Sequence, residues 1–458
     1  MKKFFKLEEY NTTVGKEVLA GVTTFFTMAY ILFVNPLVLS DAGLPFNGVY
    51  IATIFAAVVG TMIMGVFANL PYAQAPGMGL NAFFAYTVVI LNGYTPFEAL
   101  ALVFVCGILN IIITVTSFRK HLIKAIPETL QQAIGAGIGL FIAYIGMLNV
   151  NLIEFGAVPT LTNFTNPNVL LALIGLAITI VLMLKNVKGA ILIGIILTTI
   201  IGIPMGVVDV QASLSSGLSY SAVFKDFGSI FGKALGSEGI VSLFKNHSLT
   251  KIIPIVLAFS LTDTFDTIGT FIGTGRRSGI FDEAEQESME TGSGLSSRLE
   301  RGLFADAFAT MAGAVFGTSN VTTFVESSAG IEVGGRTGLT AVVTSGMFLL
   351  SILIAPVISL VPSAATAPAL IIVGILMSAS FADIEWGNFE LAIPAFFTVI
   401  MTVLSYSISN GIAFGFVAYI LVNVVQGKAK EVHPIIYGSA ALFVLNFVMI
   451  AVEALKAV

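Results

Sequence analysis

The chain has 458 residues, of which 56% are hydrophobic and only 10% are charged, and its mean hydropathy is +0.97. Soluble proteins carry about 25% charged residues, so this composition excludes a soluble globular protein and indicates a polytopic membrane protein. The net charge of −5 excludes little, because in membrane proteins the placement of Lys and Arg matters more than their sum. Nothing in the composition favours binding to nucleic acid.

The single cysteine, Cys106, lies in an apolar run, so an internal disulfide and a metal cluster of thiolates are both excluded. We expect Cys106 to serve core packing, and we expect neither a metal nor a cofactor. The basic first residues are not followed by a short apolar core with a small-residue cleavage site, so no cleaved signal peptide is predicted.

Apolar segments follow one another along the chain, each about 17 to 25 residues long, the length that spans a bilayer, or an interrupted variant of that length. Seven precede a polar connection at 207–250, seven follow it, and one more lies at the C-terminal end. The predicted segments are 17–39, 48–69, 75–91, 98–117, 131–150, 168–185 and 189–206, then 252–272, 302–317, 320–334, 338–361, 365–380, 389–406 and 409–426, and finally 434–455.

Basic residues predict the orientation of these segments. Sixteen of the 21 Lys and Arg residues lie at the N-terminus or in the gaps that share its side of the membrane. Four of the other five lie in or beside the long 207–250 connection, where the positive-inside rule is weak. The sequence therefore predicts a multi-pass protein of the cell (inner) membrane with a cytoplasmic N-terminus and an extracytoplasmic 207–250 loop.

An odd number of spans in each half makes the second half enter the membrane upside down relative to the first, which is the inverted-repeat plan of secondary transporters. Residues 166–204 and 387–425 share a layout in which two apolar spans are joined by a tight turn containing Gly189 or Gly411. The predicted divisions are 1–206 for the first repeat, 207–250 for the connection, 251–426 for the second repeat and 427–458 for the C-terminal apolar segment.

The stretch 317–335, GTSNVTTFVESSAGIEVGG, has a composition that excludes a lipid-facing helix. Residues 321–323 favour extended backbone, whereas the residues from Glu326 onward favour a short helix that ends near Gly334. Inside a membrane, non-helical backbone occurs only where it is buried in protein or lines a wet cavity. This broken segment, and its counterpart LPYAQAPGMGLNAFFAY at 70–86, are therefore candidates for the binding site. The alternative is a cytoplasmic loop.

Two carboxylates interrupt the eighth segment, in the run FSLTDTFDTIGTF. Burying one carboxylate in a helix centre costs roughly 2.5 to 3.5 kcal/mol on insertion scales, so Asp263 and Asp266 need a cavity, a partner or a proton. At about 100° per residue they share a stripe with Thr267 and Thr270, and we expect this stripe to face a polar interior with Glu326. The alternative is that one of the aspartates caps a backbone break or joins two helices.

All three histidines lie in predicted loops, so a proton taken up inside the membrane would reside on a carboxylate. Asp306 is interpreted as structural. Glu332 and Arg336 are four residues apart and are expected to pair with each other. The candidates for proton coupling are Asp263, Asp266 and Glu326.

Five runs, in order along the chain, resemble one family. They are TTFFTMAYILFVNP (23–36), APGMGLNAFFAY (75–86), FDTIGT (265–270), ESSAGIEVGGRTGLTAVV (326–343) and APALIIVGILM (367–377). The chain is similar to the nucleobase–cation symporter-2 family, in particular to its adenine/guanine/hypoxanthine permease branch, also called the azaguanine-resistance branch.

This resemblance implies an all-α membrane protein with fourteen transmembrane segments in two inverted seven-segment repeats, and with short strands in the broken segments 3 and 10. Segments 1–4 and 8–11 would form a core domain, and segments 5–7 and 12–14 a gate domain. The segment at 434–455 exceeds the fourteen, so whether it crosses the membrane is open.

The resemblance also implies the site. The acidic residues that hold the nucleobase correspond to Asp266 and Glu326, and Asp263 and Asn81 stand in motifs of the same branch. Some pyrimidine-transporting relatives place a histidine where this chain has Thr270, so coupling through that histidine is excluded. Phe83, Phe84, Phe265 and Phe324 are candidates for stacking on the base. The full predicted substrate site comprises Asp266, Glu326, Asp263, Asn81, Gly77, Phe265, Thr323 and Ser327.

The predicted function is import of purine nucleobases by proton symport with alternating access, in a membrane transporter and not an enzyme. Asp263 favours hypoxanthine and guanine over adenine, since a second carboxylate accepts from the N1–H that adenine lacks. Alternatives are an adenine-selective permease, a transporter of uracil or xanthine, an ion channel, or an intramembrane aspartyl protease. The protease is disfavoured because both aspartates lie on one segment and no GxGD motif occurs. Sodium coupling and a homodimer are left open.

Overall fold

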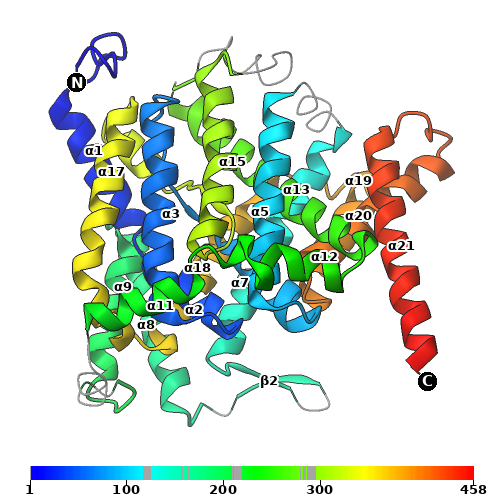
Figure 1. Cartoon of the computed structure of the whole chain (residues 1–458), viewed down its shortest axis with the longest axis horizontal. Helices are drawn as coiled ribbons and strands as arrows, with labels where there is room; N and C mark the ends of the chain where they lie inside the picture. Colours follow the sequence, from blue (N-terminus) through cyan, green and yellow to red (C-terminus); the bar gives the residue numbers. More distant parts are fainter. Residues whose placement is uncertain are drawn as a thin grey trace.

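A computed structural model describes residues 2–116, 125–155, 158–162, 164–208, 210, 219–278, 280–281, 285 and 295–457. Within these ranges, nine helices are long and apolar enough to cross a membrane, and shorter apolar helices lie among them. Most run roughly side by side in one bundle (Figure 1). The chain is thus an all-α membrane protein. Arg119, Lys120 and Lys124, which the orientation argument used, and residues 211–218 of the predicted 207–250 loop lie outside the described residues.

The elements before the long connection form the first half of the chain. They are α1 (Val14–Met28), α2 (Ile31–Asp41), α3 (Phe46–Val66), β1 (Gln74–Pro76), α4 (Met78–Ala82), the π-helix η1 (Phe83–Leu91), α5 (Pro96–Val115), α7 (Glu128–Asn149), β2 (Ile153–Phe155), β3 (Pro159–Leu161), α8 (Pro167–Leu184) and α9 (Ala190–Gly202).

The connection and the second half contain the remaining elements. They are α11 (Tyr220–Ile230), the 3-10 helix η2 (Lys233–Leu235), the π-helix η3 (Ser237–Val241), α12 (Ser242–Asn246), α13 (Leu249–Ser278), α15 (Arg298–Phe316), β4 (Val321–Thr323), α16 (Ser327–Glu332), α17 (Gly338–Leu350), the 3-10 helix η4 (Ser351–Leu360), α18 (Ser363–Met377), the 3-10 helix η5 (Ser378–Asp383), α19 (Phe389–Leu404), α20 (Ile408–Val425) and α21 (Pro434–Ala457).

Local sequence signals define the ends of the helix that leads into the second broken segment. Ser297 and Glu300 form a capping box at the start of α15, in which each side chain accepts a backbone N–H of the other. The helix ends at Gly317, whose φ of 99° lies in the left-handed region that glycine adopts most easily. The chain then continues as extended backbone into β4. These signals place a non-helical stretch deep inside the bundle.

The two broken segments meet through their short strands, β1 and β4, which form one hydrogen-bonded pair and are called the crossed strands below. β1 pairs with β4 in antiparallel register, with Gln74 opposite Thr323, Ala75 opposite Thr322 and Pro76 opposite Val321. Both strands are fully buried, so the pairing satisfies backbone groups that lipid could not. The strands expected at segments 3 and 10 are confirmed, and α16 begins at Ser327, as the composition predicted.

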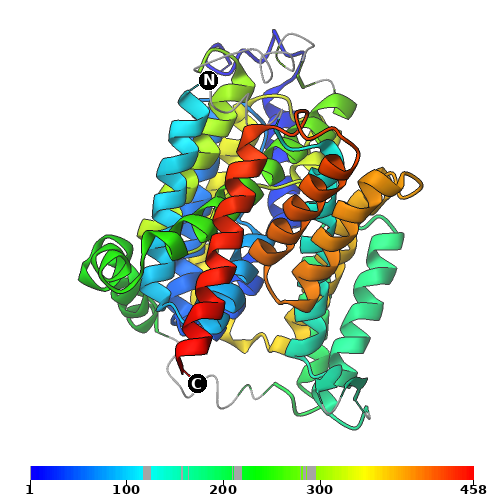
Figure 2. The same cartoon turned by 90° about the vertical axis from the view of Figure 1, so that its right-hand side faces the viewer.

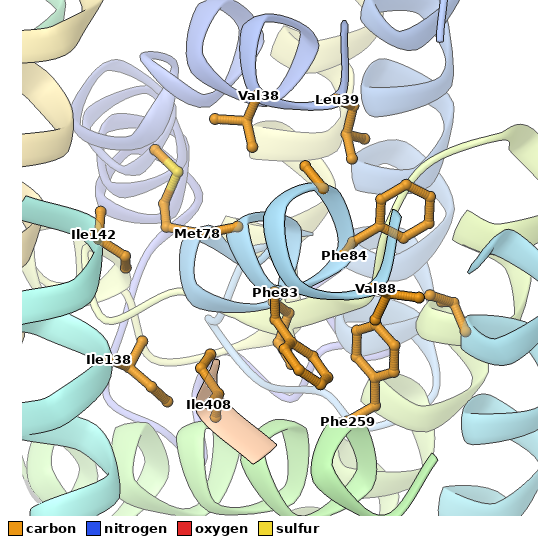
Figure 3. Packing of buried hydrophobic residues seen from close by; sticks show 14 of the residues in the cluster. Val38, Leu39, Met78, Phe83, Phe84, Val88, Ile138, Ile142, Phe259 and Ile408 are labelled. Carbon is orange, nitrogen blue, oxygen red and sulfur yellow. The ribbon is translucent and has the colours of Figure 1, made fainter. Parts of the chain in front are cut away.

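The helices pack as two sets, and the strands β1 and β4 contact α3 and α15 of the first set. In one set α15 packs on α3 and α5, and α17 packs on α1 and α3; in the other α7 packs on α18 and α19, and α8 packs on α9 and α18. Apolar side chains fill part of the contact between the sets, where Ile138 and Ile142 of α7 and Ile408 of α20 surround the start of α4 (Figure 3). The assignment of these sets as core and gate domains stays a prediction.

Several predicted segments differ in detail from the structure. The first is two helices, since α1 ends at Met28 and α2 begins at Ile31. An antiparallel hairpin of β2 and β3 follows α7, and the sequence analysis did not predict it. The connection contains the helix α11, which packs across α3, while α12 packs against α5 (Figure 1). The last apolar segment forms α21, which packs against α20 and α13 (Figure 2).

Candidate functional site

The two aspartates of α13 lie in different surroundings. Asp263 is completely buried, and its Oδ2 accepts from Asn110 Nδ2 at 2.9 Å and Asn320 Nδ2 at 3.3 Å. Asp266, nearly one turn further along, is only half-buried and lies beside Thr322 of β4. The predicted stripe is therefore polar, as expected. Its two aspartates have different neighbours, however: Asp263 contacts Asn110 and Asn320, and Asp266 lies beside Thr322.

Glu326 sits immediately before the first turn of α16, at its N-cap position. Its Oε1 accepts a hydrogen bond of 2.5 Å from the hydroxyl of Tyr30, which lies at the break between α1 and α2. A carboxylate at a helix N-terminus also interacts favourably with the N–H dipoles there. The sequence analysis did not predict Tyr30, although a phenol inside an apolar span was a usable signal.

Asp266 and Glu326 lie close enough for their charges to interact, and both are half-buried. Gly269 and Val325, which neighbour them along the chain, are exposed. Among the described residues, neither carboxylate forms an ion pair with Lys, Arg or His. The pair therefore presents acceptor oxygens without a cation, which suits a neutral ligand that donates N–H groups.

The first broken segment contributes close packing. Gly77 N donates to the carbonyl of Asn320 at 2.9 Å, and a Cβ on Gly77 would lie 2.9 Å from Thr322 Oγ1. Asn81 is fully buried; its Nδ2 donates to Asn35 Oδ1 at 3.1 Å, while its own Oδ1 has no partner in the described part of the chain. The structure thus places Gly77 and Asn81 beside the crossed strands. Their contact with a substrate stays a prediction.

Three other predicted site residues use their side chains inside the protein. Ser327 Oγ accepts from Ala73 N at 3.0 Å, so it ties α16 to the start of β1. Thr323 Oγ1 donates to Asp306 Oδ1 at 2.9 Å. Phe265 is 8% exposed. These contacts position the strands and α16, and the role of the three residues in substrate binding stays a prediction.

All four of the proposed stacking residues, Phe83, Phe84, Phe265 and Phe324, are buried in the structure. Phe83 and Phe84 are 0% exposed, and Phe83 packs edge-to-face on Phe259 with ring centroids 4.7 Å apart (Figure 3). Residues 83–88 of η1 are buried, whereas Ile90 and Leu91 at its end are exposed, and the role of Phe83 and Phe84 in stacking on the base stays a prediction. Phe324 lies two residues before Glu326 in the chain and is 6% exposed.

The expected ion pair between Glu332 and Arg336 is wrong. The Arg336 guanidinium donates to the carbonyl oxygens of Ile331 and Gly335 at 2.6 and 2.7 Å. Glu17 accepts from the Arg336 backbone N–H at 2.9 Å. The reason is that α16 ends at Glu332, so the two side chains do not share the helical geometry that an i,i+4 pair requires.

Comparison with known proteins decides the family. Residues 15–414 match the permease family. The chain belongs to this family. The permease is 41% identical to a guanine/hypoxanthine permease of Bacillus subtilis, over 96% of this chain and 99% of the relative. It is 37% identical to an adenine permease of Escherichia coli, over 98% and 96%. The protein is therefore a membrane transporter and not an enzyme.

Solved structures support the fold. The permease resembles the transmembrane domain of a cyanobacterial bicarbonate transporter with a TM-score of 0.60 and 16% identity, over 86% of this chain and 96% of that domain. At this identity the likeness concerns the fold alone. Thus the helices of the permease are arranged as in that domain.

Proposed function

We propose that the permease imports purine nucleobases across the cell membrane by proton symport, with hypoxanthine and guanine preferred over adenine. The observation that carries this proposal is the pair of half-buried carboxylates, Asp266 and Glu326, at the crossed strands of a permease whose relatives include guanine/hypoxanthine and adenine permeases. No histidine lies inside the predicted spans, so the proton resides on a carboxylate.

Purine chemistry matches these acceptors. Guanine and hypoxanthine carry an N1–H, and guanine adds a neighbouring amino group, so a carboxylate accepts from adjacent donors on one edge of the ring. Adenine lacks the N1–H. A site built around that hydrogen bond rejects an analogue that cannot make it, because its buried acceptor is then left unpaired. Tyr30 already occupies Glu326 Oε1, which leaves the second oxygen for the base.

The architecture proposed for transport follows the inverted-repeat plan. Fourteen segments form two seven-segment repeats, the N-terminus is cytoplasmic, and the half-helices behind β1 and β4 start at the membrane centre. The set containing α3, α5, α15 and α17 is the core domain, and the set containing α7, α8, α18 and α19 is the gate domain. The apolar contact around Ile138 and Ile408 lets one set move against the other without breaking ion pairs (Figure 3).

Uptake of radiolabelled hypoxanthine into proteoliposomes with an acidic exterior tests the proposal. We expect uptake to be concentrative, to stop with a protonophore, and to be inhibited more by guanine than by adenine or uracil. Glu390→Gln is a matched control, because Glu390 is exposed and pairs only with the exposed Lys428 among the described salt bridges. Stronger inhibition by adenine would favour the adenine-selective alternative. The similarity to the Escherichia coli adenine permease is the reason to include this alternative. Uptake indifferent to the protonophore would exclude proton coupling.

A further inference from the structure

Behind the crossed strands lies a second pair of carboxylates, which braces α13 against α15. Asp263 of α13 faces Thr310 of α15, whose hydroxyl lies 3.1 Å from Asp263 Oδ2. One turn away, Thr267 of α13 donates to Asp306 Oδ1 of α15 at 2.7 Å. The two contacts are reciprocal, since each helix supplies one aspartate and one threonine. The sequence analysis treated Asp306 as structural and did not foresee this pairing.

Both carboxylates are sealed from solvent, with Asp263 0% and Asp306 4% exposed. Their threonine contacts hold the two carboxylates about one helical turn apart at the contact between α13 and α15, so their charges repel each other when both are ionised. The titratable groups around them are Cys106 of α5, Asp266 on the same helix as Asp263 and, beyond Asp266, Glu326 with Tyr30. None of these carries a positive charge, and no described Lys, Arg or His pairs with either aspartate.

Hydrogen-bond donors are in short supply at this place. Asp263 Oδ1 and Asn320 Oδ1 are buried and have no partner within the described residues, although the Asn320 amide donates to the other oxygen of the same carboxylate. The Thr310 hydroxyl has one proton and two acceptors in range, Asp263 Oδ2 and the Val321 carbonyl at 2.9 Å. A buried acceptor without a donor costs about 1 to 3 kcal/mol. One further hydrogen would relieve the shortage.

We propose that Asp263 and Asp306 carry a single proton between them and form the coupling-ion site, separate from the substrate carboxylates Asp266 and Glu326. In this assignment Asp263 no longer belongs to the substrate site in which the sequence analysis placed it. This inference rests on the proposed function. Two unpaired charges in a sealed, low-dielectric interior are far costlier than one, and the shared proton also supplies the missing donor. During transport an O–H bond forms on one carboxylate from water on the acidic side and breaks to water on the other side; no other bond changes.

The same pair is connected to both broken segments. Gln74 of β1 donates to Asp306 Oδ1 at 3.2 Å, and Thr323 of β4 donates to the same oxygen at 2.9 Å. Asn320, directly before β4, donates to Asp263. Loss of the proton changes the charge that these three side chains face. The proton can therefore bias the position of the strands, and through them the substrate carboxylates on their other side.

Asp263→Asn and Asp306→Asn test the assignment, since each keeps the shape of a protonated carboxyl. Purine affinity, purine exchange and acid-driven accumulation are measured on each variant in the same liposomes. We expect affinity at acidic pH within about threefold of the wild type, with exchange retained and accumulation lost. The rise of affinity on acidification, up to about tenfold per pH unit in the wild type, should flatten. Asp266→Asn and Glu326→Gln should instead lose purine binding.

The outcomes separate the two proposals. If the wild type binds no purine, the proposed function fails; if it accumulates purine but Asp263→Asn and Asp306→Asn still follow the pH gradient, only the shared-proton site fails. Accumulation driven by a sodium gradient would also overturn the site. Should both Asn variants misfold, Thr267→Val and Thr310→Val decide, because they remove the reciprocal contacts and keep both carboxyls. We expect a displaced pH dependence of affinity, and an unchanged one would overturn the inference.

Discussion

The two broken segments occupy corresponding places in the two halves but differ in chemistry. The first, from Leu70 to Leu91, contains no charged residue, and α4 continues into a π-helix whose first residues, including Phe83, Phe84 and Val88, lie in the apolar core (Figure 3). The second contains Glu326 at the start of α16, with the exposed Val325 beside it. The strands pair with each other, so both segments supply the scaffold. Only the second segment contains a half-buried carboxylate, Glu326.

The comparison teaches that a shared scaffold leaves the two segments free to take separate tasks. The first uses small residues for close approach, with Gly77 against Thr322 and Gly79 against Ile138. The second segment uses polar residues: Glu326 accepts a hydrogen bond from Tyr30, and Thr323 donates one to Asp306 of α15, which fixes the position of β4. The following predictions test this division, beginning with the largest expected effect.

Gly330→Val should abolish transport. A Cβ at Gly330 of α16 would lie 2.1 Å from Thr24 Oγ1 and 2.6 Å from the Ala20 carbonyl of α1, so the backbone of one helix must move. Gly79→Val should also impair transport, but less, because its Cβ would meet a side-chain methyl group, Ile138 Cγ2 at 2.4 Å, rather than a backbone carbonyl. Uptake per folded protein is the measurement. Gly438→Val is the control, since nothing lies within 4 Å of that position; equal uptake by the Gly330 variant and this control would contradict close packing.

Interrupted segments often contain glycines because the backbone there needs a positive φ, but these glycines have another role. Neither Gly79 nor Gly330 has a positive φ, nor does Gly77. Their backbones are conformationally ordinary, and the need for glycine comes from neighbouring helices. Replacement by Ala should therefore be tolerated where the neighbour is a flexible side chain and costly where it is a carbonyl.

Glu326→Gln should weaken purine binding by about 1.5 to 3 kcal/mol, the value of a hydrogen bond to a charged group, which corresponds to roughly 10- to 150-fold in Kd. Equilibrium binding of guanine to the purified protein measures this. The variant should unfold at nearly the wild-type temperature, because the amide still accepts from Tyr30. Wild-type affinity in a well-folded variant would remove Glu326 from the substrate site.

Tyr30→Phe should weaken purine binding by about 0.5 to 1.5 kcal/mol, less than the loss of Glu326 itself. The phenol holds Glu326 Oε1 at 2.5 Å and is 1% exposed, so it positions the carboxylate without facing solvent. A pH profile of binding provides a readout that a packing role would not move, since an unheld carboxylate titrates differently. If Tyr30→Phe costs more than Glu326→Gln, then Tyr30 itself contacts the base.

Glu332→Gln should change stability by less than about 0.5 kcal/mol, as exposed surface substitutions do. Glu332 lies on the same short helix as Glu326 but is exposed and has no salt bridge to Arg336 in the described structure. Thermal unfolding and uptake, both compared with the wild type, check this. A large loss of stability would restore the ion pair that the sequence predicted.

The sequence by itself determined the membrane class, the limits of most apolar segments, the two interruptions and the carboxylates inside the membrane region. It could do so because hydropathy over a span and the residues that break a helix act locally. Asp266, Glu326 and the strand at 321–323 were predicted in this way, and the family resemblance was confirmed through the match at residues 15–414.

Only the tertiary structure decided which carboxylates meet. Asp263 and Asp266 are only three residues apart. Asp263 is buried and bonded to Asn110, whereas Asp266 is half-buried, like Glu326. The structure also added residues to the site through contacts between distant parts of the chain. Tyr30 bonds to Glu326, 296 residues away, and Gln74 bonds to Asp306. No periodicity within one segment encodes which neighbour a buried side chain will face, because that depends on how separate helices pack. The same packing buried Phe83 and Phe84.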